Sequence, residues 1–331
     1  MRSSFATYFF SLILCVFFVE TPLSGQKFRQ TRQHDVRPDN MDQYRARREL
    51  INQNYSRPES TSHEISKTDT GLQRPVKSKK KGFGYQLGFS SKIYYSNNPL
   101  SAPSGLDKVS AGIWENSINN NFLLGAYDLR GSTFSPILSI SYTNFNHFGH
   151  TFVPKIDFGS LNLNFAGIFT FGKGWSIRPS IGYTADFSSS DGMSRTYSQL
   201  SPAIALGKNF SIGKVSSFLD FSLGYTSTNS VVPSPIPDDL LDRFETSLTW
   251  GISAPFGNFE FNPYLRLALA DYSNQSKTDF SGNLGLDLSY HLTDWMILRL
   301  YSTFSTRSSS LDGTDFTKLE AGTGASLSAR F

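Results

Sequence analysis

Residues 319–331, LEAGTGASLSARF, alternate between two kinds of side chain along their whole length. One set of alternate positions is mostly apolar: Leu319, Ala321, Thr323, Ala325, Leu327, Ala329 and Phe331. The other set is polar or glycine: Lys318, Glu320, Gly322, Gly324, Ser326, Ser328 and Arg330. Because successive side chains of a β-strand point to opposite faces, this period of two predicts a strand with one apolar and one polar face.

The same period returns throughout residues 83–331, in segments bounded by Gly, Asn, Ser, Asp or Pro. Twelve strands are predicted, at 83–95, 120–129, 132–146, 156–171, 175–187, 194–208, 214–228, 242–254, 259–272, 279–291, 295–307 and 316–331. A soluble β-sandwich also alternates, but its strands usually have about five or six residues. A strand that crosses a bilayer needs about 9 to 11 residues, which these segments reach repeatedly. An open edge in lipid would leave backbone groups without partners, so the sequence predicts an all-β fold, a closed antiparallel transmembrane β-barrel.

The connections between the predicted strands alternate between tight and long, as the hairpins of a barrel do. The tight ones are 130–131, 173–174, 209–213, 255–258 and 292–294. The least regular strand is 120–129, because it is short and follows a long connection at 96–118. Ten strands are the alternative if that segment is a loop, and either number is even, as bacterial barrels require.

Composition excludes several helical classes. Aromatic residues make up 15% of the chain and charged residues only 18%, whereas a helical bundle or coiled coil is rich in Leu, Ala and Glu. The mean hydropathy is -0.29, and the long apolar run is confined to the N-terminus, which excludes a polytopic helical membrane protein.

Residues 1–25 have the layout of a cleavable secretory signal peptide. The apolar stretch 8–19 (YFFSLILCVFFV) follows a positively charged start and precedes two small residues, with cleavage expected before Gln26. An N-terminal anchor is the alternative, but about 12 apolar residues are short for a hydrocarbon core of ~30 Å. Cys15, the one cysteine, lies within this stretch, so the mature chain is expected to hold no disulfide and no thiol ligand.

Residues 26–82 are a basic arm. They contain 14 Lys+Arg and 7 Asp+Glu, whereas residues 83–331 contain 16 and 19. The arm is poor in large apolar residues and ends in the lysines 79–81, a composition that predicts disorder, with one short helix expected at 39–52. The arm is interpreted first as a solvated tail; the alternatives are that it inserts into the lumen or that it meets acidic cell-wall or lipid groups. Nucleic acid is not an expected partner, because the chain is exported and the arm has few aromatic rings to stack on bases.

The signal peptide, the even set of amphipathic strands and the final strand ending in Phe331 make residues 83–331 resemble bacterial outer-membrane β-barrel proteins. The resemblance implies a multi-pass barrel in the outer membrane of a Gram-negative-type bacterium, surrounded by lipid, with both termini and the arm on the periplasmic side. It also implies that the barrel-assembly machinery reads the C-terminal strand, with Phe331 as the signal. Such barrels include solute channels, autotransporter translocators and lipid hydrolases, so the architecture does not choose the function.

Strand parity predicts which charged side chains point into the barrel. The basic ones are Lys92, Arg178, Arg243, Arg266, Arg299, Arg307, Lys318 and Arg330, and the acidic ones are Asp186, Asp220, Glu245, Glu260, Asp287 and Glu320. The same face carries many Gly, Ser and Thr residues, which leave volume open. The sequence therefore favours a passive channel for small hydrophilic solutes, lined by these residues, whose basic excess gives a weak preference for anions. The alternative is a closed structural or interaction barrel that displays external loops, with its charges paired and filling the interior.

His147 and His150 are the nearest approach to a metal or catalytic motif, and both are predicted in an external loop. With Asp157 as the nearest carboxylate they form an incomplete metal site. A lipid hydrolase at the rim is a minor alternative, because no nucleophile motif accompanies them. The sequence thus predicts no enzyme, cofactor or metal.

Two external connections, 96–118 and 229–241, are long and contain apolar residues. The first is a candidate to fold inward and narrow the lumen, with Trp114 and Glu115 as lining residues. The second is stiffened by three prolines and is a candidate recognition surface, although such loops are often only variable surface.

Overall fold

The computed structural model describes residues 83–99, 101–102, 109–149, 157–189, 193–230 and 241–330, except for the side chains of Ser230 and Arg330. The predicted signal peptide and arm, Phe331 and most of the proline-containing connection lie outside this part of the chain, so what was predicted for them stays a prediction. Among the described residues, no helix is long and apolar enough to cross a membrane.

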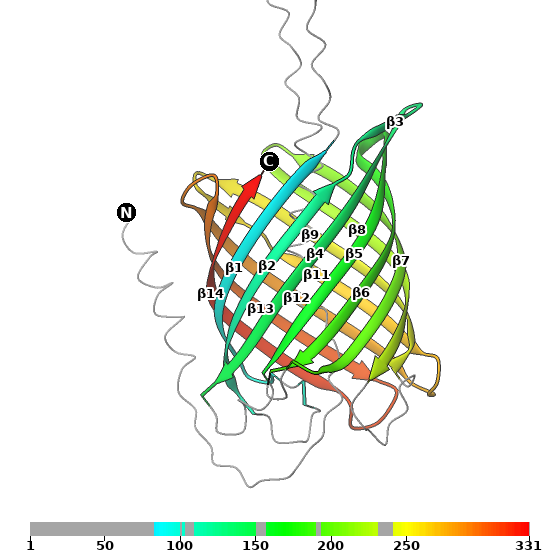
Figure 1. Ribbon diagram of the computed structural model, residues 1–331, viewed down its shortest axis with the longest axis vertical. Coiled ribbons are helices and arrows are strands. Elements are labelled where there is room, and N and C mark those ends of the chain that lie inside the picture. Colours follow the sequence, from blue (N-terminus) through cyan, green and yellow to red (C-terminus); the bar gives the residue numbers. More distant parts are fainter. Residues whose placement is uncertain are drawn as a thin grey trace, which may run out of the picture. The chain divides into compact units, whose positions relative to one another are not determined.

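All the described strands belong to one antiparallel sheet (Figure 1). They are β1 (Gly84–Ser96), β2 (Ala111–Leu123), β3 (Tyr127–Leu129), β4 (Ser132–Phe148), β5 (Phe158–Phe171), β6 (Trp175–Ser188), β7 (Arg195–Ile212), β8 (Val215–Ser230), β9 (Arg243–Phe256), β10 (Phe259–Phe261), β11 (Tyr264–Tyr272), β12 (Thr278–His291), β13 (Met296–Ser309) and β14 (Phe316–Arg330). β1 pairs with β14, with Phe89 opposite Leu327, so the sheet closes on itself.

Twelve strands form the wall of this barrel. β3 only extends the β2–β4 hairpin, and β10 and β11 share one place between β9 and β12. The interruption between them falls at Pro263, which has no backbone N–H to give to the sheet. The predicted closed barrel of twelve strands is confirmed, and the ten-strand alternative is wrong.

The two ends of the barrel differ in their connections. The end where β1 begins and β14 ends carries the short turns, and we call it the turn end; the opposite end is the loop end. Arg130, Lys173 and four glycines of these turns have positive φ, including Gly213 at 59° and Gly257 at 65°. Tight hairpin turns require such angles, which glycine adopts most easily. One predicted turn, 209–213, is shorter than expected, because β7 and β8 stay paired up to Ile212 opposite Val215.

The second strand differs most from its prediction. β2 begins at Ala111, so residues 111–118 of the predicted loop 96–118 are strand, and 127–129 is β3. The period of two was hidden because β2 carries polar residues on both faces. The outward Asn120, for example, accepts a hydrogen bond from the Tyr85 hydroxyl at 2.7 Å. The predicted lining role of Trp114 is wrong, because its ring faces outward, 48% exposed, and its Nε1 donates to Ser91 Oγ.

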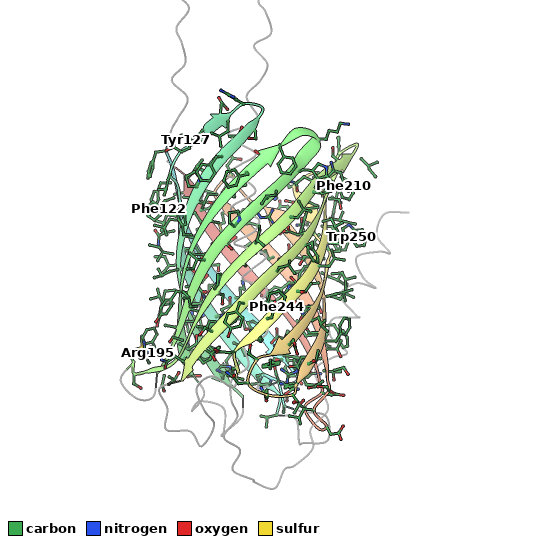
Figure 2. The ribbon with its side chains drawn as sticks, turned by 90° about the vertical axis from the view of Figure 1, so that its right-hand side faces the viewer. Phe122, Tyr127, Arg195, Phe210, Phe244 and Trp250 are labelled. Carbon is green, nitrogen blue, oxygen red and sulfur yellow. The ribbon has the colours of Figure 1, made fainter. Side chains whose placement is uncertain are left out.

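The outer face of the barrel is apolar and the inner face is polar. Large apolar side chains stand exposed on the outer face, among them Phe244 and Trp250 of β9 (Figure 2). The alternate positions bury serine, threonine, asparagine and charged groups, for example Ser117 and Thr184. A closed sheet with this arrangement satisfies its backbone within the wall and offers hydrocarbon an apolar surface.

Aromatic pairs surround the turn end on the outside. Tyr85 stacks on Phe122 with ring centroids 5.0 Å apart, and Phe134 stacks on Phe169 at 4.5 Å. The Lys208 ammonium lies 5.0 Å from the centre of the Trp175 ring. Amphipathic rings and lysines of this kind suit the level of lipid head groups, so this end of the apolar belt has the composition of a membrane interface.

Inside the barrel, aromatic rings lie over glycines of the neighbouring strand. The Tyr264 ring covers Gly285, where an added Cβ would overlap the ring. A Cβ at Gly282 of the same strand would meet Thr306 and Leu267 at ordinary distances of 3.5 and 3.7 Å. We expect Gly285→Ala to lower the free energy of unfolding by about 1–3 kcal/mol through overpacking, and Gly282→Ala to change it little. Urea unfolding of the two variants in micelles checks this, and equal effects would contradict the packing described.

Candidate functional site: the inner wall

Every residue predicted to point inward and whose side chain is described occupies an inward position. Lys92 is 5% exposed, for example, while the next residue, Ile93, is 55% exposed on the outer face. Arg330 was also predicted to point inward, but its side chain is not among those described, so its prediction stays untested. The structure shows that these side chains point inward. Their role as the lining of a pore is a proposal.

Many of the inward charges form ion pairs along the wall. Each described pair joins groups on the same strand, on adjacent strands, or on two strands that are separated by a single strand. The pairs are Lys92–Glu115 (3.0 Å), Arg266–Glu245 (2.6 Å), Arg243–Glu245 (3.7 Å), Lys318–Glu320 (3.4 Å), His291–Glu260 (3.1 Å), Arg307–Asp279 (3.9 Å) and Arg178–Asp220. Their side chains therefore lie against the sheet.

The pair between Arg178 and Asp220 shows how the wall accommodates this arrangement. Arg178 is on β6 and Asp220 on β8, so the pair passes over β7 at Gly207. A Cβ at Gly207 would lie 2.7 Å from an Arg178 nitrogen and 3.3 Å from an Asp220 oxygen. A side chain at this position would have to displace the Arg178 guanidinium, so glycine lets the pair lie close to β7.

Two inward acidic groups were not among the predicted strand residues. Glu115 was named as a candidate lining residue but placed in a loop; it lies on β2 and accepts hydrogen bonds from Lys92 at 3.0 Å and from the Tyr94 hydroxyl at 3.3 Å. Asp279, at the start of β12, has the same parity as the predicted Asp287 and is 3% exposed. With these two counted, no basic excess remains among the described inward groups, so the expected weak preference for anions loses its basis.

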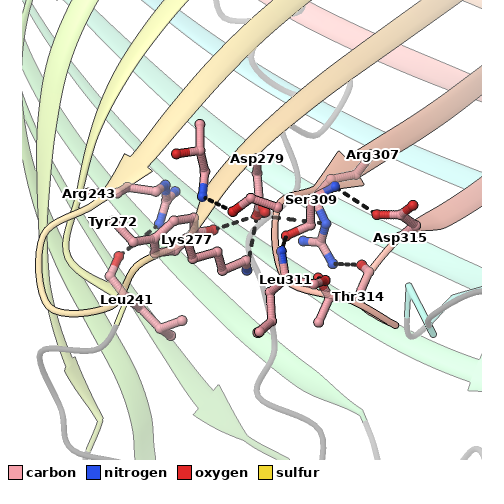
Figure 3. A network of polar contacts seen from close by, with 12 residues as sticks. Leu241, Arg243, Tyr272, Lys277, Asp279, Arg307, Ser309, Leu311, Thr314 and Asp315 are labelled. Atoms are coloured by element: carbon pink, nitrogen blue, oxygen red, sulfur yellow. Dashed lines mark hydrogen bonds and ion pairs between the residues drawn. The ribbon is translucent and has the colours of Figure 1, made fainter.

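A network of polar contacts closes around Asp279 at the loop end (Figure 3). Its carboxylate accepts a hydrogen bond from the Tyr272 hydroxyl at 3.0 Å and pairs with Lys277 at 3.0 Å. The Lys277 ammonium also lies 4.3 Å from the centre of the Tyr272 ring. Arg307 donates to the carbonyl oxygen of Thr314 and packs over the Phe316 ring. The network thus holds the β11–β12 connection through Lys277 and the β13–β14 connection through Thr314.

Burial lowers the pKa of the Lys277 ammonium from its ordinary value of 10.5, and nearby Arg307 and Arg243 add to this, while Asp279 opposes it. A lowered pKa means that the folded protein releases this proton at a lower pH than the unfolded chain does. Stability therefore rises with pH between the folded pKa and about 10.5. We expect the difference in unfolding free energy between the native protein and Lys277→Met to shift in favour of the native protein across this window. Urea unfolding at a series of pH values measures it, and a difference that is flat with pH would contradict the assignment.

His147 is a strand residue, contrary to its predicted place in an external loop. Asp157 accepts a hydrogen bond from the His147 backbone N–H at 2.7 Å and lies 3.1 Å from the ring Nδ1. These contacts extend the ordered part of β4 past the last pair with β5, Phe145 opposite Phe158. His150 lies outside the described residues, and within them no three His, Cys, Asp or Glu side chains are grouped so as to hold a metal ion.

A small cavity of about 70 Å³ lies inside the loop end, and we call it the loop-end pocket. Strands β1, β2, β4, β5, β13 and β14 contribute to it. Its charged residues are Glu115, Lys318, Glu320 and His147, and its apolar ones include Ile113, Phe145 and Phe158. Sequence reasoning did not bring these residues together, because they meet only through the closure of the sheet.

The connection after β1 is pinned beside this pocket. Asn98 is fully buried; its side chain donates to the carbonyl oxygens of Ala102 at 2.9 Å and Thr317 at 3.2 Å, and accepts from the Ala102 N–H at 2.7 Å. Pro99, next in the chain, lines the pocket. The beginning of this connection thus lies against the pocket. This agrees with the prediction that the connection folds toward the lumen.

No protein-family model and no curated protein matches the sequence. Solved structures resemble it at low identity. The NanC porin is 13% identical with a TM-score of 0.41, over 73% of this chain and 98% of that chain. An outer-membrane channel from Pseudomonas putida F1 is 11% identical with a TM-score of 0.46, over 74% and 96%. The β domain of the Bordetella autotransporter BrkA is 12% identical with a TM-score of 0.38, over 74% and 99%.

Similarity at this level concerns the fold alone. The closed sheet of twelve strands, its apolar outer face and its polar inner wall are features of the chain itself. By these features the chain is a closed β-barrel of twelve strands with the surface pattern of a transmembrane barrel.

Proposed function

We propose that the barrel is a passive channel through which small hydrophilic solutes diffuse. The observation that carries the proposal is the way the inward charges are held. Paired groups held close to the wall, as Arg178 and Asp220 are over Gly207, would leave the axis of the barrel open to solvent. A ring of polar and paired groups lowers the barrier for a hydrated solute without holding it tightly.

One sector of the wall supports the same function. On β6, β7 and β8 the inward positions are mainly small residues: Ser180, Gly182, Ser201, Ala203, Ala205, Ser222 and Gly224. Small side chains leave volume in a barrel whose strand number lies between those of filled and open barrels. Solute size and polarity would then set the rate, with little selection by net charge.

Liposome swelling with uncharged sugars of increasing size tests the proposal. The refolded mature protein should admit pentoses and hexoses, with a rate that falls steeply toward trisaccharides. No swelling by folded protein would favour the closed barrel that displays its loops. Loss of lipid turnover on changing His147 would instead favour the hydrolase, whereas a channel shows no turnover to lose.

The small-residue sector gives a sharper test with a matched control. Ala203 of β7 faces inward, and the next residue, Ile204, is 49% exposed on the outer face. We expect Ala203→Trp to slow the swelling rate for hexoses several-fold by narrowing the lumen, and Ile204→Trp to leave it unchanged. Equal rates for the two variants would contradict the assignment of this sector to a pore.

The proposed channel also has an orientation. The turn end and the basic arm would face the periplasm, where the arm can meet acidic cell-wall or lipid groups, and the loop end would face outward. The C-terminal strand would be recognised by the assembly machinery. Protease digestion of intact cells that removes loops but spares an epitope on the arm would support this orientation.

A further inference from the structure

We infer that one arc of the turn end binds the head groups of anionic phospholipids. The binding surface consists of four cations on three successive turns, and we call it the cationic rim: Arg130, Lys173, Lys208 and Lys214. The rim lies at the edge of the outer face, so the inference goes beyond the proposed channel and does not depend on an open lumen. It rests on where the cations lie, on the backbone that carries them and on the surface beside them.

The cations are concentrated on one side of the turn end. The turns from β3 to β4, from β5 to β6 and from β7 to β8 carry all four, against one carboxylate, Asp128, in residues 127–132, 171–175 and 208–215. Three of the four cations are exposed. The turns from β9 to β10 and from β12 to β13 carry no lysine or arginine, and the second carries Asp294. Among the turns, the arc from β3 to β8 is therefore the one that attracts anions.

Two of these cations occupy backbone positions that suit other residues. Arg130 and Lys173 have positive φ, 44° and 63°, and each is followed by a glycine that also has positive φ. Tight hairpin turns with two such residues prefer Asn, Asp or Gly at the first position, because most other side chains are strained there. The same departure in two separate turns indicates that the cation itself has a role at these tips.

Lys208 shows that the rim meets the apolar belt. It occupies an outward position of β7 between Trp175 of β6 and Leu219 of β8, which are 38% and 41% exposed on the outer face. Its ammonium donates to the Lys173 carbonyl oxygen and lies 5.0 Å from the centre of the Trp175 ring. The exposed ring of Phe210 stands at the same edge (Figure 2). The charge of Lys208 thus reaches the turn while its stem starts on the belt, as lysines at the head-group level do.

A phospholipid matches both parts of this surface. The charges of Lys173 and Lys208 are held at one turn, next to an indole ring that faces the lipid side. A lipid phosphate can reach them while its acyl chains lie against the belt, whereas an acidic polymer in solution would gain only the contact with the charges. Each lysine or arginine near an anionic membrane surface is worth about fivefold in affinity.

Fluorescence quenching by brominated lipids tests the inference in the refolded protein, from residue 26 onward, in phosphatidylcholine vesicles. A form that keeps Trp175, with phenylalanine at the other three tryptophans, reports on the rim, and a form that keeps only Trp114 reports on the loop end. We expect brominated phosphatidylglycerol to quench Trp175 at least about threefold more effectively than brominated phosphatidylcholine, and the two lipids to quench Trp114 equally. High salt should weaken the preference at Trp175, because the attraction is electrostatic.

Lys173→Asn separates binding from folding. Asparagine suits the backbone of this turn, so the variant should unfold in phosphatidylcholine at the same or a higher urea concentration, while the preference at Trp175 is largely lost. Arg195→Gln, which removes an exposed cation of the loop end, should leave that preference unchanged. If the single-tryptophan forms do not fold, the native protein gives the same comparison: its urea midpoint should rise when phosphatidylglycerol is added, and should rise less in Lys173→Asn.

Three results would overturn the inference: no preference at Trp175, an equal preference at Trp114, or an unchanged preference in Lys173→Asn. For the native protein, the corresponding result is an equal rise of the midpoint in Lys173→Asn. Absence of a lipid preference, with retention of the native protein but not of Lys173→Asn on an acidic polysaccharide, would assign the rim to a polymer instead.

Discussion

Replacing Ile181 with arginine is expected to lower the free energy of unfolding by about 2–4 kcal/mol, the loss seen for a charge on the lipid face near the bilayer midplane. Ile181 lies at the middle of β6, 46% exposed on the outer face, between Phe165 of β5 and Pro202 of β7. A guanidinium group there has no water and no partner in hydrocarbon. Urea unfolding of the protein in lipid vesicles measures the loss.

The control for this substitution is the preceding residue. Ser180 lies on the same strand but on the inner face, so arginine at this position would enter the polar lumen. We expect Ser180→Arg to change the unfolding free energy by less than about 1 kcal/mol. Equal losses for Ile181→Arg and Ser180→Arg would show that the two faces meet the same surroundings, and the transmembrane interpretation would fail.

Replacing Glu115 with alanine is expected to lower the unfolding free energy by about 3 kcal/mol. Lys92 and Glu115 are opposite each other on β1 and β2, and their side chains are each 6% exposed. Removing the carboxylate leaves a buried ammonium without its main counter-charge, which is far more destabilising than removing both groups. The double variant Lys92→Met/Glu115→Leu should therefore recover most of the loss.

An exposed pair on the same wall provides the comparison. His291 and Glu260 lie 3.1 Å apart at the turn end, and their side chains are 42% and 30% exposed. Water replaces such a partner readily, so Glu260→Gln should lower the unfolding free energy by less than about 1 kcal/mol. If Glu115→Ala costs no more than Glu260→Gln, the Lys92–Glu115 pair is hydrated rather than buried.

The architecture was predictable because the two faces of most strands differ strongly. Large apolar residues such as Phe221 and Leu223 on β8 leave no doubt about which side meets hydrocarbon. The prediction was wrong where that contrast is weak. On β2 the outward Asn120 is satisfied by the Tyr85 hydroxyl of the neighbouring strand, a contact that no periodicity reveals.

The site was less predictable than the fold, because its contacts depend on register. Parity correctly placed Arg178 and Asp220 on the inner face, but their pairing across Gly207 joins residues 42 positions apart. The loop-end pocket likewise needs β1 to meet β14, so that Lys318 and Glu320 come near Glu115. His147 was placed in a loop because its partner, Asp157, lies beyond the hairpin.

Single-channel conductance in planar bilayers tests the channel most directly. A form that begins at the predicted cleavage site, residues 26–331, would be compared with a form that also lacks residues 26–82. Discrete ohmic steps are expected from both forms, and larger steps after deletion would identify the arm as a plug. Absence of conductance from both forms, with folded barrel demonstrated by heat-modifiable mobility on a gel, would contradict an open lumen and favour the closed structural barrel.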